Sequence, residues 1–497
     1  MGRLRAQYSA RRRDRQRGPR PDEKHLDHRE GPLAVALRHV QYDQHPKLRY
    51  ARRAREFGRF PQSVEHGRRA APDSSECADH FLKGKAGSPG CVPGSGSVRK
   101  RTSAVRRPQR MNILTLSTTF PNPQEPVLGV FVYSRMQHVA TRAGVRVVAP
   151  VPLVDYSRAG GRLFCAGAPF RRCVGRLEVY HPRWFYPPKG GALNAVFLFA
   201  RCWPLLRRLD REARIDVVDA HFGHPEGVAA ALLAVALDRP FVVTLRGNET
   251  MHASYPFRRK ALGWALRRAA GVITVSSALR DFALSMGVAP ERARVIPNGV
   301  DTSVFYPRPR SRPAGAAKVI LSAGYLIERK GHHHVIRAAA RLRARGVSCE
   351  LWIAGGPGRE GQFEERLRSL TAELKMEDAV RFLGAVPPAR LAELMSQADV
   401  FCLASSREGW PNVVNEALAC GTPVVATRIG GVPELLPSPE YGMIVEPGDP
   451  QGLEAALETS LSREWDRAEI ARWGQSRSWD QVAREAADFL EQAIKRR

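Results

Sequence analysis

Short apolar runs alternate with longer segments of mixed polarity from residue 111 to near the end of the chain. Runs rich in Val and Ile and bounded by turn residues are typical of buried strands, and the mixed segments are typical of helices that pack on a sheet. The predicted strands are 113–117, 145–149, 217–221, 241–245, 271–276, 318–323, 350–354, 380–383 and 400–404. The predicted helices are 131–143, 227–237, 257–269, 332–345, 361–374 and 388–398. This alternation predicts parallel α/β sheets.

The alternation is interrupted by a polar segment rich in Pro and Arg over residues 306–317. A segment of this composition is typical of a linker, and it separates 111–305 from 318–476. A further helix is predicted over 477–497, and a turn containing Pro, Asn and Gly over 296–301. Because ligands bind at the carboxyl ends of strands in open α/β sheets, two such domains facing each other would share one cleft.

Two carboxylates, Glu408 and Glu416, are separated by seven residues that begin with Gly-Trp-Pro. Pro411 suits a helix start, so the helix N-terminus is predicted to lie between the two carboxylates. Such an N-terminus attracts phosphate, and eight helical positions rise about 12 Å, close to the length of a sugar, a diphosphate and a ribose in a row. Two solvated helix residues are the ordinary interpretation of this spacing. The Gly-Trp-Pro turn and the buried strand that follows favour a ligand site instead.

The segment 408–417, followed by Cys-Gly-Thr-Pro over 420–423, resembles the Glu-x7-Glu motif of the retaining glycosyltransferases of family 4, also called group 1. The resemblance covers about residues 111–475. It implies the GT-B fold, with two facing Rossmann-like domains, parallel sheets and an interdomain cleft. It also implies transfer of a hexose from a nucleotide diphosphate sugar to a hydroxyl acceptor with retained anomeric configuration. The usual proposal for these enzymes is front-side attack assisted by the leaving phosphate.

The resemblance gives roles to residues of the second domain. Lys330 matches the lysine of the family's Gly-Arg-Leu…Lys-Gly segment, where a cation stabilises the leaving diphosphate. Tyr325 stands where the family often has arginine, and Arg329 is the candidate replacement. Glu408 is implied to hold sugar hydroxyls and Glu416 the ribose. Gly409 and Asn412 complete the donor-binding set in this domain.

The first domain contributes Gly129, in the loop after its first strand, and Arg246, after the strand 241–245. A glycine lets the backbone approach a phosphate or an acceptor closely, although a plain turn glycine is an equal alternative. The resemblance places Gly129 in the donor site and Arg246 at the sugar or acceptor. A salt bridge at the end of the strand is the alternative for Arg246.

The acceptor candidates also follow strands of the first domain. Asn248 and Glu249 come shortly after Arg246, and His221 and His224 flank another strand end. Each histidine is equally well explained as a structural side chain with satisfied hydrogen bonds.

No metal and no cofactor are expected, since the nucleotide sugar is a substrate. The run His332, His333 and His334 cannot face one ion, because adjacent helical residues point about 100° apart. The chain also lacks an Asp-x-Asp sequence at a predicted strand end. This absence fits a GT-B enzyme that works without metal.

The 497-residue chain has a formal charge of +29, and more than half of this charge falls in residues 1–110. This segment has no sustained hydrophobic period. It could be a disordered arm that binds RNA or acidic lipid, or a transit-like peptide, which its acidic residues disfavour. The favoured interpretation is an upstream extension from a wrong start codon, with the working protein beginning at Met111.

The eight cysteines lack a Cys-x-x-Cys pair and are interpreted as reduced thiols of a cytoplasmic protein. The apolar stretch 192–206 is too short to span a membrane. It is interpreted as a helix packed on the sheet or, through Phe197, Phe199, Trp203 and nearby arginines, as a contact with the membrane surface. By analogy, a basic first domain suits a lipid-linked or oligosaccharide acceptor at the inner face of the membrane, as in cell-surface polysaccharide synthesis.

Two other classes stay open. A GT-B nucleotide-sugar epimerase would have the same fold and need no acceptor. A nucleic-acid-binding protein would explain the arginines. No specific nucleic acid partner is expected, however, because the basic density is greatest in residues 1–110 and no RNA motif with interleaved aromatic residues is present.

Overall fold

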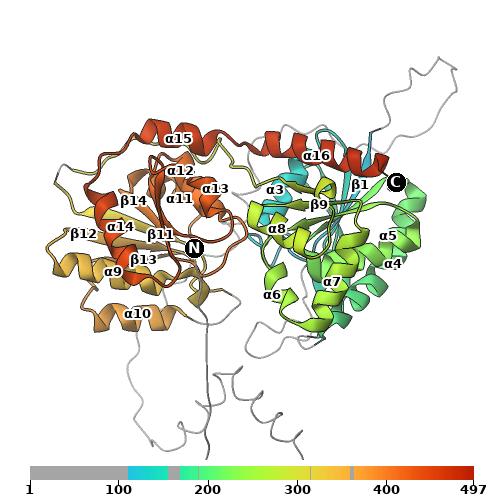
Figure 1. The fold of residues 1–497 in the computed structure, drawn as a ribbon, viewed down its shortest axis with the longest axis horizontal. Helices are drawn as coiled ribbons and strands as arrows, with labels where there is room; N and C mark the ends of the chain where they lie inside the picture. Colours follow the sequence, from blue (N-terminus) through green and yellow to red (C-terminus); the bar gives the residue numbers. More distant parts are fainter. Residues whose placement is uncertain (1–109, 155–167, 188–189, 314, 359–362, 497) are drawn as a thin grey trace, which may run out of the picture. The chain divides into compact units, whose positions relative to one another are not determined.

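The computed structural model describes residues 110–154, 168–187, 190–313, 315–358 and 363–496. The extension predicted over residues 1–110 therefore lies outside the described chain, except for its last residue. Two parallel-stranded α/β parts follow each other along the sequence (Figure 1). We call residues 110–305 the first half and residues 318–475 the second half.

The first half is built on an eight-stranded sheet with the order β10-β9-β8-β7-β1-β2-β5-β4. All neighbouring strands are parallel except β4, which is antiparallel to β5. The strands are β1 (Asn112–Leu116), β2 (Gly144–Val148), β4 (Arg171–Val174), β5 (Leu177–Tyr180), β7 (Val217–His221), β8 (Phe241–Leu245), β9 (Gly271–Thr274) and β10 (Ala293–Val295). The short strands β3 (Val151–Pro152) and β6 (Arg183–Trp184) form a separate pair.

Alternate residues of these strands enter two different cores, as the two-residue period of a strand requires. Leu114, for example, packs with helices on one face of the sheet, and Ile113 packs on the other face. The helices of the first half are α3 (Val130–Val139), α4 (Asn194–Glu212), α5 (Val228–Leu237), α6 (Glu249–Ala253), α7 (Pro256–Arg268) and α8 (Ser277–Ser285). Residues of α4, α5 and α7 form the first core, and α3 lies on the opposite face.

The second half has a six-stranded, wholly parallel sheet with the order β13-β12-β11-β14-β15-β16. Its strands are β11 (Lys318–Ala323), β12 (Cys349–Ala354), β13 (Val380–Gly384), β14 (Val400–Leu403), β15 (Val424–Thr427) and β16 (Gly442–Val445). Its helices are α9 (His332–Ala344), α10 (Glu364–Glu373), α11 (Pro388–Gln397), α12 (Asn412–Ala419), α13 (Val432–Leu435), α14 (Pro450–Ser462) and α15 (Arg467–Gln475). One face is covered by α9, α10 and α14, and the other by α11, α12 and α15.

The last helix, α16 (Trp479–Lys495), packs on the sheet of the first half. Its residues Trp479, Val482 and Phe489 are buried in the same core as Ile113 and Val132. Figure 1 shows α16 beside α3, far from it in sequence.

The predicted linker is anchored on the second half by ion pairs. Arg310 and Arg312 both contact Asp399, at 2.7 and 2.6 Å. The described part of the segment has no regular secondary structure, and its two ion pairs with Asp399 attach it to the second half.

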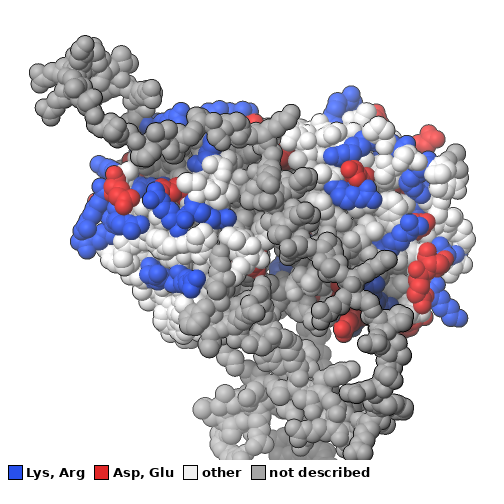
Figure 2. Space-filling model, turned by 180° about the vertical axis from the view of Figure 1, so that it is seen from behind, with Lys and Arg blue, Asp and Glu red and all other residues white. Residues whose placement is uncertain are grey.

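Lys and Arg side chains on the face shown in Figure 2 are interspersed with Asp and Glu. No helix within the described ranges is long and apolar enough to cross a membrane. In α4, the predicted membrane contacts Phe197, Phe199 and Trp203 are partly buried against the core, which agrees with the packed-helix interpretation.

Candidate active site

A cavity of about 700 Å³ lies where loops at the strand ends of both halves meet. This volume is within the range of sites that bind small molecules and cofactors. Eight of the predicted site residues line it: Gly129, Arg246, Asn248, Arg329, Lys330, Glu408, Gly409 and Asn412. Four others do not: His221, His224, Glu249 and Glu416.

Lys330 and Glu408 form an ion pair in this cavity, with 2.6 Å between Nζ and Oε1. Lys330 ends a short 3₁₀ turn after β11, and Glu408 lies in the loop after β14. The hydroxyl of Ser405 donates a hydrogen bond to the same oxygen of Glu408 at 3.0 Å. The two strand-end loops therefore hold a cation and a carboxylate together within the second half.

Arg329 also reaches Glu408, with 3.9 Å between Nη1 and Oε1. Its guanidinium donates to the carbonyl oxygen of Arg407 at 3.3 Å. Tyr325, which stands at the position of the missing arginine, lines the cavity too. Lys330 and Arg329 thus place two positive charges around one carboxylate.

Helix α12 begins at Asn412, and Pro411 is the residue just before it. The helix N-terminus therefore lies between the two carboxylates, as the spacing predicts. Glu416 is half-buried in the first turns of α12. Burial raises the pKa of Glu416 to about 7, and the positive charge of Lys330 opposes this shift. The charge of Lys330 thus influences both carboxylates.

Gly409 is a point of close approach between the halves. A Cβ at this position would collide with the carbonyl oxygen of Arg246 and lie close to the Cα of Gly247. A glycine is required here because two backbones meet, one from each half.

Arg246 lies in a buried network at the end of β8. Its Nε and Nη2 atoms lie 3.1 and 2.8 Å from Nδ1 of His221, and His221 Nε2 lies 3.0 Å from Asp219 Oδ2. Burial lowers the pKa of His221 to about 4, with Asp219 opposing and Arg246 adding to the shift. The neutral ring therefore donates from Nε2 to Asp219 and accepts at Nδ1 from Arg246. The ring of Phe131 lies 4.8 Å from the Arg246 guanidinium carbon, a cation–π distance.

Two of the other acceptor candidates lie away from the cavity wall. The carboxylate of Glu249 accepts hydrogen bonds from the backbone amides of Gly223, Arg246 and Gly247 at 2.6 to 3.2 Å. His224 is buried beside His252, with 5.1 Å between the ring centroids, and within the described chain neither of its ring nitrogens has a hydrogen-bond partner. The structure therefore gives Glu249 and His221 supporting positions, and it brings only Asn248 of the four candidates to the cavity.

Gly129 precedes α3 with a φ of 67°, in the left-handed region. A Cβ there would collide with the carbonyl oxygen of Thr119 in the same loop. The residue thus meets a backbone requirement of its turn and also lines the cavity.

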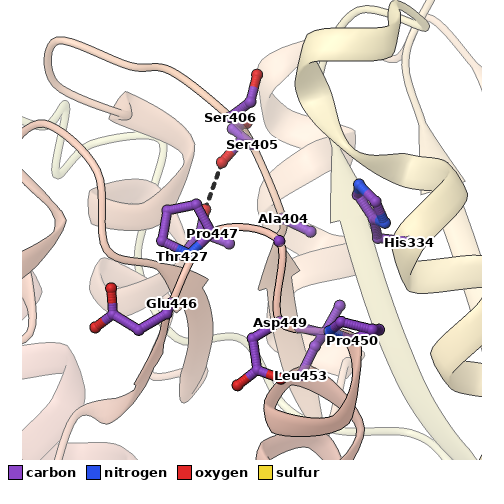
Figure 3. Close-up of a pocket in the computed structure, with 11 residues that line it drawn as sticks. His334, Ala404, Ser405, Ser406, Thr427, Glu446, Pro447, Asp449, Pro450 and Leu453 are labelled. Carbon is purple, nitrogen blue, oxygen red and sulfur yellow. Dashed lines mark hydrogen bonds between the residues drawn. The ribbon is translucent and has the colours of Figure 1, made fainter. Parts of the chain in front are cut away.

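A second cavity, of about 50 Å³, lies at the carboxyl ends of β14, β15 and β16 in the second half (Figure 3). His334 from α9 and Ser405, Thr427 and Asp449 contribute to its wall. This volume is far too small for a nucleotide sugar. Elsewhere in the histidine run, His332 is buried and hydrogen-bonded to Ser322 at 3.0 Å. In the described chain, no group of three or more His, Cys, Asp or Glu side chains is placed to hold a metal ion.

Two lining residues, Asn298 and Arg407, were not singled out from the sequence. Asn298 lies in the predicted turn over residues 296–301, directly after β10. Its position at a strand end was the available signal. Arg407 directly precedes Glu408 in the sequence. Its positive charge beside a predicted site carboxylate was the available signal.

Comparison with known proteins shows which families the chain resembles. Residues 308–477 match the family model described as Glycosyl transferases group 1, and residues 142–304 match the model described as Glycosyltransferase Family 4. WcaL of Salmonella typhimurium, a glycosyltransferase named for colanic acid biosynthesis, is 32% identical over 294 residues, which are 56% of this chain and 68% of that protein. The MMP alpha-(1->4)-mannosyltransferase of Mycolicibacterium hassiacum is 35% identical, with 45% of this chain and 54% of that protein covered.

Among solved structures, Anabaena HepE in complex with UDP superposes with a TM-score of 0.58. The match has 20% sequence identity and covers 77% of this chain and 99% of HepE. Together with the two sheets, this likeness confirms the predicted GT-B fold.

Proposed function

The chain belongs to the group 1 glycosyltransferases, and from this membership we propose that it moves a hexose from a nucleotide diphosphate sugar to a hydroxyl acceptor with retention of configuration. The single observation that carries the proposal is the ion pair of Lys330 and Glu408 in the interdomain cavity, next to the start of α12.

The proposed donor pose follows from charge and helix geometry. The diphosphate lies over the N-terminus of α12, where free N–H groups and the helix dipole favour negative charge. Lys330, with Arg329 beside it, approaches the diphosphate and stabilises the charge that grows as the glycosidic bond breaks. Once Lys330 turns to the phosphate, the carboxylate of Glu408 is free to accept hydrogen bonds from the sugar. Glu416 does not line the cavity, but its pKa responds to the charge of Lys330, which does, and we propose that its carboxylate accepts a hydrogen bond from the ribose.

The carboxylates that line the described cavity are Glu125 and Glu408. In the proposed pose the carboxylate of Glu408 is occupied by hydrogen bonds to the sugar hydroxyls. We therefore propose front-side attack, in which the leaving phosphate oxygen takes the proton of the acceptor hydroxyl. Arg246 and Asn248, on the first-half side of the cavity, are proposed to contact the sugar or the acceptor.

The test is a thermal-shift titration of the full chain with nucleoside diphosphates and nucleotide sugars, beside a Glu416→Ala variant. Dose-dependent stabilisation by one nucleotide, reduced in the variant, is expected, because a ligand that binds only the folded state raises the unfolding midpoint. Indifference to every nucleotide would contradict the donor assignment. Release of an epimerised sugar without any acceptor would favour an epimerase.

We also propose a lipid-linked acceptor and a membrane contact, supported by an exposed surface of the first half. Phe257 and Tyr255 at the start of α7 are 79% and 49% exposed, and Leu193, on an element that packs against α7, is 60% exposed. Arg259 and Lys260 are exposed beside them. Aromatic and apolar side chains flanked by cations suit an anionic lipid surface.

Co-sedimentation with vesicles tests this contact. The full chain is expected to bind vesicles containing phosphatidylserine or phosphatidylglycerol and to release them at high salt. A Phe257→Ser variant should bind less. Equal binding by the variant would contradict this surface, and the matched change Val235→Ser, at an exposed residue of α5, serves as the control.

A further inference from the structure

Asn298 lines the cavity at a point where hydrogen bonds join the two halves. It follows β10 in the first half and is only 3% exposed. Its Oδ1 accepts a hydrogen bond from Nη1 of Arg246 at 3.0 Å, and its Nδ2 donates to Oδ1 of Asn412 at 3.0 Å. Asn412 is the first residue of α12 in the second half. One side-chain amide therefore connects Arg246 to the helix that carries Glu416.

An amide suits this position because one small planar group offers both a donor and an acceptor. An aspartate would supply only acceptors, and an alanine would leave Arg246 and Asn412 without this partner. A buried polar group is costly when unpartnered, so both bonds favour the observed orientation of Asn298.

The same bond helps to fix the plane of the Arg246 guanidinium. Nε and Nη2 point to His221, and Nη1 points to Asn298. Of the five N–H groups of arginine, one on each Nη then has no partner among the described residues. Since Arg246 lines the cavity, these N–H groups are available to a ligand.

We propose that Asn298 is a positioning residue that makes the orientation of Arg246 depend on contact between the halves. Its bond to Asn412 forms when α12 lies against the first half, and the same amide then orients the guanidinium. The proposal rests on the proposed transferase function, because it takes Arg246 to contact the donor sugar or the acceptor. It goes further by assigning a role to Asn298.

Kinetics in an Arg246→Ala background test the proposal. We would measure the hydrolysis of UDP-glucose and of GDP-mannose by the full chain, in which water accepts the hexose and the nucleoside diphosphate is released. Asn298→Ala is expected to lower kcat about tenfold, the size of one hydrogen bond to a charged group, with the donor KM changed less than about threefold. The double variant Arg246→Ala/Asn298→Ala should be no slower than Arg246→Ala. If the two effects multiply instead, Asn298 acts independently of Arg246 and the proposal is overturned.

Two further variants separate positioning from a general packing defect. Asn298→Asp keeps an acceptor for Arg246, and the amide of Asn412 can rotate to donate to the new carboxylate, so kcat should stay within about threefold of wild type. Asp301→Ala, in the same turn, removes a side chain that accepts hydrogen bonds from Ser303 and should leave kcat unchanged. A loss with Asn298→Asp as large as that with Asn298→Ala would overturn the proposal.

A double-mutant cycle of thermal unfolding tests the contact between Asn298 and Asn412 and needs no activity assay. The unfolding midpoints of Asn298→Ala, Asn412→Ala and the double variant are compared with wild type. If the two residues are bonded, the double variant should unfold no lower than the less stable single variant. If the two substitutions lower the unfolding midpoint additively, the hydrogen bond between Asn298 and Asn412 does not couple the halves and the proposal is overturned. Failure to turn over either nucleotide sugar with an intact thermal cycle would instead contradict the proposed function.

Discussion

The ammonium of Lys330 and the carboxylate of Glu408 meet at 2.6 Å, and each side chain is largely shielded from solvent. The pair holds both groups at the wall of the cavity. A diphosphate that competes for Lys330 would also release Glu408, so one exchange of partners prepares both groups. The effect of removing either group can therefore be predicted.

Lys330→Ala is expected to lower kcat by about 100-fold or more, because a charge that acts mainly in the transition state is lost. Steady-state assays with the nucleotide sugar selected by thermal shift would measure this. Lys495→Ala, at an exposed lysine of α16, is the control. Unchanged turnover in Lys330→Ala would rule out its proposed role.

Glu408→Gln should separate binding from turnover. Loss of the carboxylate charge leaves Lys330 without its ion-pair partner, so UDP is expected to bind as tightly as to wild type or more tightly. The turnover of the nucleotide sugar should fall about 100-fold, because the sugar loses a charged acceptor. Isothermal titration and kinetics give the two values. Weaker UDP binding together with normal turnover would contradict this account.

Donor binding should depend on pH through Glu416. Burial raises its pKa to about 7 with Lys330 opposing, so the free protein carries a proton here below neutrality. If the ribose requires the carboxylate, the Kd should rise as the pH falls from 7 to 5, by up to about tenfold per unit, and be constant above 8. Glu416→Gln should lose this dependence. A pH profile that is the same in both proteins would show that another group, such as the phosphate itself, is responsible.

Glu226 should affect stability rather than chemistry. It is 2% exposed and accepts hydrogen bonds from the backbone amide and hydroxyl of Thr118. Burial raises its pKa from 4.5 to about 7, so the folded chain binds more protons than the unfolded chain between these values. Stability from this group therefore falls as the pH rises through that window.

The matched variant is Glu226→Gln, which cannot titrate. Its free energy of unfolding relative to wild type is expected to increase from pH 4.5 to pH 7 and then stay level, with a total difference on the order of 3 kcal/mol. Thermal unfolding at several pH values measures this. A constant difference across the range would mean that Glu226 does not titrate there.

Gly409→Ala is expected to disturb the contact between the halves. The new methyl group would meet the carbonyl oxygen of Arg246, so the two loops must separate. Turnover should fall at least tenfold, while the circular dichroism spectrum stays that of the wild type, because Gly409 and Arg246 lie in loops outside the strands of both sheets. Gly448→Ala, at an open surface turn, is the control for a glycine substitution. Normal turnover in Gly409→Ala would mean that this close contact is not needed.

Most of the fold follows from apolar periodicity. Each predicted strand is present with its bounds shifted by no more than two residues, because buried parallel strands are nearly continuous apolar runs. The antiparallel edge pair β4 and β5 was not predicted, since its exposed, Arg-rich edge lacks that signal. Helices α14 and α15 were also not predicted, although Asp449 and Asp466 cap their N-termini through side-chain hydrogen bonds.

The site was only partly accessible from sequence. Strand-end logic correctly gathers Lys330, Glu408 and Arg246 at one cavity. The same logic does not distinguish Asn248, which faces the cavity, from Glu249, which supports three backbone amides one residue later. That difference depends on the direction of each side chain after the strand, and local sequence does not specify it.

Because α16 packs on the sheet of the first half, the part of the chain that forms the first half is not continuous in sequence. The two family models divide the chain between residues 304 and 308, which suggests two separable pieces. A fragment ending at residue 304 would nevertheless lack Val482, Phe489 and Leu490, and it would expose the apolar face that they cover. Such a fragment is expected to aggregate unless residues 479–495 are supplied with it, for example as a separate peptide.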